Sequence, residues 1–449
     1  MRSLPNILEK QIRVASWARV LEVLSGVVLL LTSPSISWGL LDFEREPINY
    51  LTATPSNPVT RLQERLDNGE TKLTFEKDRG YLSSVLEQLG ISPASQMLVF
   101  SKTSFQIQRI TPHRPRAVYF NDDAFVGWVQ DGDVVEISTA DPQLGAVFYT
   151  LQQEPSENPT FVRDRGQCIV CHASSRTSNV PGHLVRSVYP APSGQPHFGA
   201  GTFSTDYRSP FHQRWGGWYV SGTHGKERHM GNVVAQNRDE PEELDVEAGA
   251  NVTNLNDLLH TARYLTPHSD IVALMVLEHQ TRMYNLITRA NFETRSACHY
   301  DLIMNKALER PLDYRSESTE RRIEAAVSDL VDCMLFVDEF YLKEPIQGTS
   351  TFTQEFAARG PHDSQGRSLR ELDLSHRLMK YPCSYLIYSE PFEKLPAATK
   401  DQVYQCLFDV LGGTDTNEKF SHLSSNDRQA ILEIVKETKS DLPGYWKTD

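Results

Sequence analysis

The sequence of 449 residues lacks any uninterrupted apolar run close to the roughly 18 residues that a membrane-spanning helix needs, which excludes a polytopic membrane protein. Basic residues are in deficit, with 45 Lys and Arg against 58 Asp and Glu and a formal net charge of −13. Nucleic-acid binding is therefore not expected, because phosphate recognition needs a basic surface. Cysteine is scarce too: six residues are too few for a disulfide scaffold. The 39% of apolar and 23% of charged residues are ordinary for a folded globular protein.

The N-terminus has the three parts of a secretory signal. Four basic residues precede the apolar segment 23–31, and the small residues Ser35 and Ser37 follow it. We therefore expect residues 1–37 to be a signal peptide and the mature protein to be periplasmic or otherwise exported. Removing four basic and two acidic residues would change the net charge from −13 to −15. A retained anchor and a buried core helix are the alternatives, and membrane attachment is expected only for the anchor.

The pattern along the chain predicts an α+β fold. Residues 38–151 form the first region, in which 43–92 have helical spacing and 117–120, 125–129, 134–137 and 146–149 read as short strands. Asp131-Gly132 is a hairpin signal, so the strands are expected to be antiparallel. Residues 152–238 are rich in Gly, Pro, Ser and His and are expected to form loops that carry function.

An acidic linker is expected at 239–265, and a helical domain at 266–449. The predicted helices of that domain are 268–296, 316–341, 368–380, 399–411 and 424–438. Thr266-Pro267 resembles a helix cap followed by a proline at the first helical position. Cys298, Cys333, Cys383 and Cys406 all lie in this domain, where they could form up to two disulfides or remain as buried thiols.

The sharpest motif is Cys168-Ile169-Val170-Cys171-His172. A separation of three residues places two thiols on one side of a helical turn, where each can form a thioether with one vinyl group of a porphyrin. The adjacent histidine then lies under the iron. The motif therefore predicts one covalent haem c with its iron bound by His172. A redox disulfide or half of a zinc site is the alternative, but no thioredoxin-like setting and no second close cysteine pair is present.

Through Cys168, Cys171 and His172 the sequence resembles c-type cytochromes. The resemblance implies haem binding by these three residues and does not extend to the fold, because small cytochromes c are helical domains of roughly one hundred residues. The whole chain resembles a class of exported bacterial single-haem proteins to which no established activity is attached.

The sixth iron ligand decides between a closed electron carrier and an open, reactive haem. The first candidate is Met230, since glycines in its loop would let the backbone approach a porphyrin. His224 or His229, His279 on the helix after Pro267, and an open position are the alternatives. Further histidines downstream of the motif are His183, His197 and His212.

Other residues could surround a haem. The anionic propionates favour arginines, and the loop segment offers Arg165, Arg176, Arg186, Arg208 and Arg214. The aromatic run 215–219 is either a core strand or a porphyrin wall. Met275, His279 and Met283 share a helix face that is expected to pack in the core, while the polar stretch 278–282 needs partners, of which a haem edge is one.

Three functions follow from a single haem. The first is electron transfer with a redox partner protein. The second is a peroxidase-like haem enzyme with an open or displaceable sixth position. The third is a haem-bearing subunit of a larger redox assembly. The sequence shows no phosphate-binding glycine loop and no serine nucleophile motif that would favour another chemistry.

Overall fold

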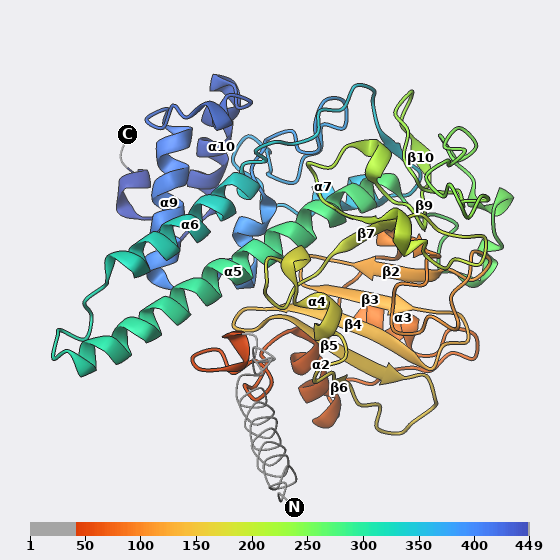
Figure 1. The fold of residues 1–449 in the computed structure, drawn as a ribbon, viewed down its shortest axis with the longest axis horizontal. Coiled ribbons are helices and arrows are strands. Elements are labelled where there is room, and N and C mark those ends of the chain that lie inside the picture. Colours follow the sequence, from red (N-terminus) through yellow and green to blue (C-terminus); the bar gives the residue numbers. More distant parts are fainter. Residues whose placement is uncertain (1–41, 448–449) are drawn as a thin grey trace, which may run out of the picture. The chain divides into compact units, whose positions relative to one another are not determined.

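The computed structural model describes residues 42–447 and has a mixed α+β fold, as predicted (Figure 1). The chain divides into two units at Arg45 and Glu46, and the description below concerns the second. The predicted signal peptide, residues 1–37, lies outside the described residues. Within residues 42–447, no helix combines the length and the apolar character that crossing a bilayer requires.

A seven-stranded antiparallel sheet forms the N-terminal half, in the order β6-β5-β4-β3-β2-β1-β9. Its strands, in chain order, are β1 (Met97–Val99), β2 (Arg116–Phe120), β3 (Ala124–Trp128), β4 (Val134–Asp141), β5 (Gly145–Gln152), β6 (Val162–Arg163) and β9 (Trp218–Tyr219). The four predicted strands are confirmed as β2 to β5. The Asp131-Gly132 hairpin is confirmed as well, since β3 pairs with β4 in the register Val126 to Ile137.

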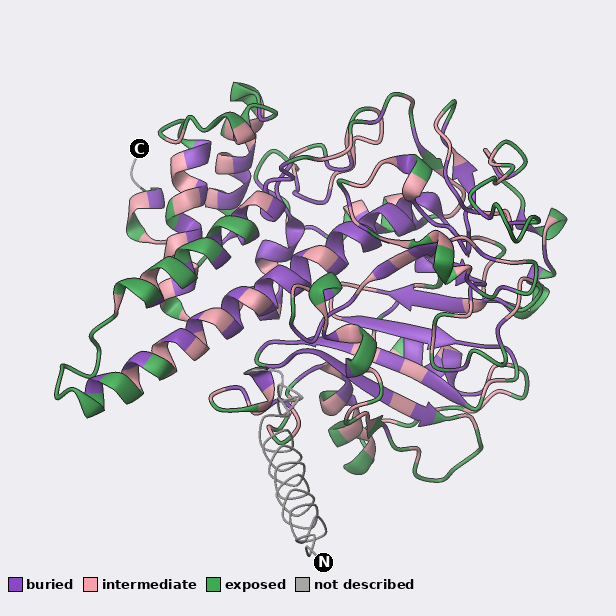
Figure 2. Ribbon diagram, viewed as in Figure 1, coloured by how far each residue is buried: buried purple, intermediate pink, exposed green. Residues whose placement is uncertain are grey.

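Both faces of this sheet are largely covered (Figure 2). Strand β3 is buried at every position, as expected of a central strand with β-branched and aromatic residues. Helices α2 (Pro58–Asp67) and α3 (Leu82–Gln88) precede the sheet, and the mainly helical character predicted for residues 43–92 is confirmed only for these two segments. Asn57 caps α2 by accepting hydrogen bonds from the backbone of Val59 and Thr60, which explains where that helix begins.

The C-terminal half is helical, and α5 (Ile271–Ala307), with 37 residues, is its central element. Figure 1 shows α5 running alongside the sheet and continuing beyond it to a hairpin with α6 (Glu317–Met334). The remaining helices are α7 (Phe352–Ala358), α8 (Glu390–Glu393), α9 (Ala397–Leu411) and α10 (Ser425–Thr438). Helix α5 begins at Ile271 and not beside Pro267, because the Asp270 carboxylate accepts from the backbone N–H groups of Val272 and Ala273.

The helix predicted at 368–380 is wrong. This segment consists of turns and bends with one isolated bridge between Leu372 and Met379. Arg370 is buried there and donates to the carbonyl oxygen of Gly360, so tertiary hydrogen bonds replace a helical ladder. The helices predicted at 268–296, 316–341, 399–411 and 424–438 are present as α5, α6, α9 and α10. Helix α5 extends further than predicted, whereas α6 ends at Met334, seven residues before the predicted end.

The segment 152–238 is rich in loops, as predicted. It contains the one-turn helix α4 (Ile169–His172) and the small sheet of β7 (Val185–Val188) with β8 (Thr202–Thr205). It also contributes β10 (Gly222–Thr223), which pairs with β11 (Gln347–Gly348) from the C-terminal half.

Candidate haem attachment site

The Cys-x-x-Cys-His motif folds into a single helical turn. The backbone N–H groups of Cys171 and His172 both donate to the carbonyl oxygen of Cys168, at 3.1 and 3.0 Å. Asp164 holds the start of this turn, because its carboxylate accepts from the N–H groups of Gly166 and Cys168 at 3.1 and 3.0 Å. The motif is therefore already in the compact geometry that the spacing of its residues predicts.

His172 forms a reciprocal pair with Gly182. The ring Nδ1 of His172 donates to the carbonyl oxygen of Gly182 at 2.9 Å, and the N–H of Gly182 donates to the carbonyl oxygen of His172 at 2.8 Å. This bond fixes the tautomer, so Nε2 carries the free lone pair. Among the described residues, no hydrogen bond to Nε2 is found. A histidine whose Nδ1 donates to a carbonyl oxygen is the usual arrangement of a metal-binding imidazole.

Helix α5 holds the loop that orients His172. The side chain of Asn285 accepts from the backbone N–H of His183 at 2.9 Å and donates to the carbonyl oxygen of His183 at 2.7 Å. Gly182 leaves room for this clamp, because a Cβ there would lie 2.2 Å from Asn285 Oδ1. Neither residue was found from the sequence, which offers no local signal that connects position 285 with the motif.

Aromatic residues of the sheet line the imidazoles. The ring of Phe148, on β5, lies 4.8 Å from the ring of His172 and 6.1 Å from that of His183. His183 is buried against Phe125 and hydrogen-bonds through Nε2 with Ser138, while its Nδ1 is buried without a partner. Burial, together with the neighbouring His172, lowers the pKa of His183 to about 3. It therefore stays neutral and adds no charge beside the site.

The two thiols differ in environment. Cys168 is partly buried, and burial together with the Asp164 carboxylate raises the pKa of its thiol to about 12. Cys171 is exposed, and Val170 between the two cysteines is 80% exposed. Both cysteines are free thiols. A thiol with a raised pKa is mostly protonated at neutral pH, and thiol–disulfide exchange needs the thiolate. The raised pKa therefore disfavours the redox-disulfide interpretation of the motif.

The five arginines considered for the haem propionates lie in different surroundings. Arg186 lies close enough to Cys171 and Arg176 for their charges to affect its pKa, although burial is the main cause of its lowering. Its Nε is buried without a partner, and its guanidinium lies over the ring of Phe198. Arg186 is thus a cation beside the motif with donor capacity to spare, as a propionate would need.

Arg214 and Arg208 are engaged elsewhere. Arg214 is buried in an ion pair with Glu278 at 2.8 Å, and Arg208 pairs with Asp206 at 2.9 Å. Arg165 is exposed, on the segment just before the motif. The arrangement leaves Arg186, with Arg176 beside it, as the arginines best placed near Cys171.

The candidate sixth ligands occupy three other places. Met230 is buried, with its sulfur 3.6 Å from Ser187 Oγ on β7. His224 and His229 lie with their rings 4.7 Å apart. His279 stacks on Phe336 at 4.2 Å. Among the described residues, none of these four forms a hydrogen bond or ring contact with His172, so the choice of sixth ligand stays a prediction.

The polar stretch on α5 finds its partners within the protein. Glu278 pairs with Arg214, Nε2 of His279 hydrogen-bonds with Ser384 at 2.8 Å, and Gln280 donates to the carbonyl oxygen of Asn121 at 2.7 Å. These partners are incomplete, because Glu278 Oε1, His279 Nδ1 and Arg282 Nε are buried without a hydrogen-bond partner. The expected core packing of Met275, His279 and Met283 is confirmed, since all three are buried.

The aromatic run 215–219 belongs to the core. Trp218 and Tyr219 form β9, which pairs with β1 at the opposite edge of the sheet from β6. Trp218 also donates from its indole N–H to the backbone carbonyl oxygen of Arg186 at 2.8 Å, so the run lies beside β7 as well as in the core. The choice between a core strand and a porphyrin wall stays a prediction.

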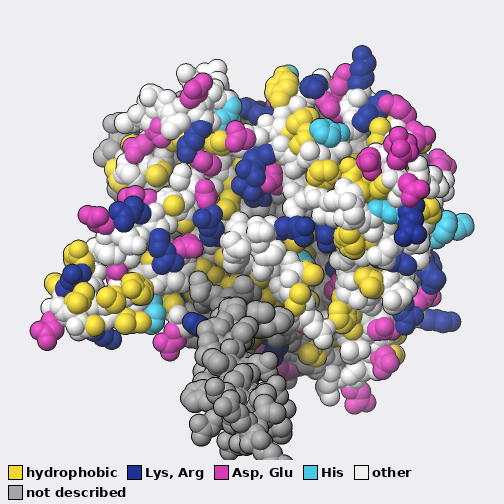
Figure 3. All heavy atoms as spheres, in the orientation of Figure 1, with side chains coloured by type: hydrophobic (Ala, Val, Ile, Leu, Met, Phe, Trp, Pro, Cys, Tyr) yellow, Lys and Arg dark blue, Asp and Glu magenta, His cyan; other side chains and the backbone are white. Residues whose placement is uncertain are grey.

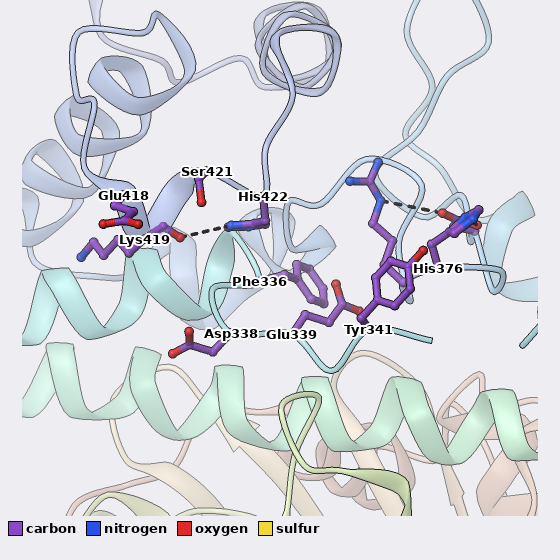
Figure 4. A pocket seen from close by; sticks show the side chains of 11 residues that line it. Phe336, Asp338, Glu339, Tyr341, His376, Glu418, Lys419, Ser421 and His422 are labelled. Carbon is purple, nitrogen blue, oxygen red and sulfur yellow. Dashed lines mark hydrogen bonds and ion pairs between the residues drawn. The ribbon is translucent and has the colours of Figure 1, made fainter. Parts of the chain in front are cut away.

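A cavity of about 510 Å³ lies away from the motif, in the C-terminal half (Figure 4). Glu339, Tyr341 and His422 are among its lining residues. The ring of His422 lies between the carbonyl oxygens of Lys419 and Leu335, at 3.2 and 2.7 Å. Burial raises the pKa of Glu339 to about 7. The cavity brings none of the predicted haem residues together.

The residues around the motif fit a haem in three respects. Two free thiols share one helical turn, an imidazole presents Nε2, and Arg186 has an unpaired buried donor. Within residues 42–447, no group of three or more His, Cys, Asp and Glu is arranged to hold a bare metal ion. A haem iron needs fewer protein ligands, because the porphyrin supplies four nitrogens.

The cysteines of the C-terminal half are all free thiols, so the disulfides considered above are not formed.

Comparison of the chain with models of protein families, with curated proteins and with solved structures finds no match. Function is therefore inferred from the residues of the site itself.

Proposed function

We propose that this chain is an exported protein that carries one covalent haem c, attached through Cys168 and Cys171, with His172 as an iron ligand. One observation carries the proposal: the motif turn holds both thiols beside an imidazole whose Nδ1 is already bonded to Gly182 and whose Nε2 is not. The haem, when bound, supplies an iron that cycles between the ferric and ferrous states.

The protein's own residues set the surroundings of that iron. Gly182 fixes the orientation of the His172 ring, and the hydrogen bond to its carbonyl oxygen increases the basicity of the ligand nitrogen. Phe148 packs against the ring in a tilted arrangement, with 4.8 Å between the ring centres. Arg186, with Arg176 beside it, and Arg116, whose charge acts on both Cys168 and His172, are cations near the motif that a propionate could use.

Electron transfer with a redox partner protein is the role that the surface of the site supports best. Cys171 and Val170 are exposed, so a haem attached there would have an edge at the surface, within reach of a partner. The haem-enzyme and redox-assembly alternatives remain distinguishable by experiment: ferrous protein that binds carbon monoxide would favour the enzyme, and co-purification from the native host would favour the assembly.

The test is expression of the full chain in a host with cytochrome c maturation machinery. The wild type should keep its haem after acid–acetone extraction and gain the mass of one haem. Cys168→Ala with Cys171→Ala should lose covalent haem, whereas Cys406→Ala, in helix α9, should keep it as the matched control. A wild-type product that is colourless and has the mass of bare polypeptide would overturn the proposal.

A further inference from the structure

Hydrogen bonds decide which histidines could bind the iron opposite His172. An imidazole binds a metal through a ring nitrogen with a free lone pair, and the other ring nitrogen then carries the proton. A nitrogen that accepts from a backbone N–H, or that carries the proton itself, is not available to the iron. The histidines downstream of the motif differ in this respect.

His224 and His229 have their lone pairs in use. Nδ1 of His224 donates to the carbonyl oxygen of Glu227 at 2.8 Å, and its Nε2 accepts from the N–H of Asn251 at 2.9 Å. Nδ1 of His229 accepts from the N–H of Gly231 at 3.0 Å, so its Nε2 carries the proton. Either ring would have to give up a backbone hydrogen bond before it could bind iron.

Met230 and His279 are enclosed in the core. The Met230 sulfur lies 3.6 Å from Ser187 Oγ, and the residue is 3% exposed. His279 is fully buried, stacks on Phe336 and uses Nε2 for a hydrogen bond with Ser384. Binding of a surface haem by either side chain would require the core to rearrange.

His183 and His212 lie on the wrong sides. His183 follows Gly182, whose carbonyl oxygen binds Nδ1 of His172, so it belongs to the side of that ring away from Nε2. His212 is exposed on the short turn 211–213, which packs on the C-terminal half.

His197 is both available and close to the motif. Its Nε2 is buried without a hydrogen-bond partner among the described residues. It lies in the connection between β7 and β8, where the next residue, Phe198, has its ring 5.1 Å from the guanidinium of Arg186. The charge of Cys171 acts on Arg186, so this connection lies beside the second cysteine of the motif.

The surroundings of His197 have the room and the character that a porphyrin needs. Phe198 is 52% exposed, and Val170 in the motif is 80% exposed. A Cβ at Gly199 or Gly201 would meet no atom of the described residues within 4 Å. On the face of the molecule that carries α4 and β7 in Figure 1, Figure 3 shows hydrophobic and basic side chains next to one another. Aromatic rings can cover a porphyrin face, and arginines can bind its propionates.

We propose that His197 binds the haem iron through Nε2 at the position opposite His172. This role requires the covalent haem of the proposed function, on which it rests. The connection between β7 and β8 would then cover the haem face that His172 does not. Two imidazole ligands give a closed, six-coordinate iron with a lower reduction potential than an imidazole and a methionine sulfur.

The test is the absorption spectrum of the matured full chain. The wild type should be low-spin, and its ferrous form should not bind carbon monoxide. His197→Ala should keep covalent haem but become high-spin and bind carbon monoxide, and added imidazole should restore the low-spin spectrum. His197→Met should stay low-spin with a higher reduction potential. Met230→Leu and the matched control His212→Ala should have the spectrum of the wild type.

A haem-free measurement separates a ligand from a structural residue. Nε2 of His197 has no hydrogen bond to lose within the described structure, so the haem-free His197→Ala chain should unfold at nearly the wild-type urea concentration. With covalent haem present, a low-spin His197→Ala, a high-spin wild type or a high-spin Met230→Leu would overturn the ligand role and leave the proposed function intact. A wild-type product without covalent haem would overturn both.

Discussion

The loop that orients His172 should depend on a single side chain of helix α5. Asn285→Ala removes both hydrogen bonds to the backbone of His183, at 2.9 and 2.7 Å, and leaves a buried N–H and a buried carbonyl oxygen unpaired. An unpaired buried polar group costs about 1 to 3 kcal/mol, so with two such groups the variant should lose about 2 to 6 kcal/mol of unfolding free energy. Urea unfolding, followed by circular dichroism, measures this loss.

The matched control is Asn291→Ala on the same helix. Asn291 is also buried, and it donates to the carbonyl oxygen of Pro142 at 3.2 Å, away from the motif. It should cost about 1 to 2 kcal/mol. The two variants should differ further in the haem-loaded protein, where only Asn285→Ala should disturb the absorption spectrum that reports iron ligation. Unchanged urea stability in Asn285→Ala, or identical spectra for both variants, would show that the clamp does not position His172.

Three further predictions concern buried groups. Gly182→Ala should destabilise the protein by about 1 to 3 kcal/mol in urea unfolding, because its Cβ would displace Asn285; wild-type stability would contradict the close contact. Burial lowers the pKa of His279 in the folded protein to about 3, below its value in the unfolded chain. Unfolding therefore takes up a proton between about pH 3 and 6.5, so the free energy of unfolding falls as the pH falls through this range. His279→Gln should make this pH dependence shallower by up to about 1.4 kcal/mol per pH unit, and an unaltered slope would refute a buried neutral imidazole. Glu278→Ala should cost about 3 to 5 kcal/mol because it leaves the buried Arg214 guanidinium without its counter-charge, with only its hydrogen bonds to the carbonyl oxygens of Ser209 and Tyr207. R214M/E278L should recover part of that loss; equal losses in the two proteins would refute this account.

Local patterns were sufficient to predict the central strands and most of the helices. The strands β2 to β5 are short β-branched and aromatic runs with a hairpin signal at Asp131-Gly132, and this information is all within a few residues. The helix predicted at 368–380 is wrong because the apolar spacing there resembles that of a helix. In the structure, buried Arg370 instead hydrogen-bonds to the carbonyl oxygen of Gly360, outside this segment.

In the candidate site, too, some residues could be predicted from the sequence and others could not. The three motif residues could be found from the sequence because their spacing is itself the chemical signal. The groups that position them could not, since Gly182 and Asn285 meet only through the tertiary fold, and a glycine or an asparagine has no pattern that marks such a role. The polar stretch of α5 is an opposite example. Its polar residues stand out in the sequence, but their partners, an ion pair and hydrogen bonds within the core, can be seen only in the fold.

The clamp between His183 and Asn285 joins positions 102 residues apart. A nascent chain that ended soon after the motif would therefore contain both thiols, the imidazole and the local pair between His172 and Gly182, but not the Asn285 side chain that clamps the neighbouring residue. If the chain carries the proposed haem, attachment through the two thiols would need only the motif, whereas the full orientation of His172 would wait for helix α5 to dock. A fragment that stops before α5 would then be a substrate for attachment that lacks the Asn285 clamp.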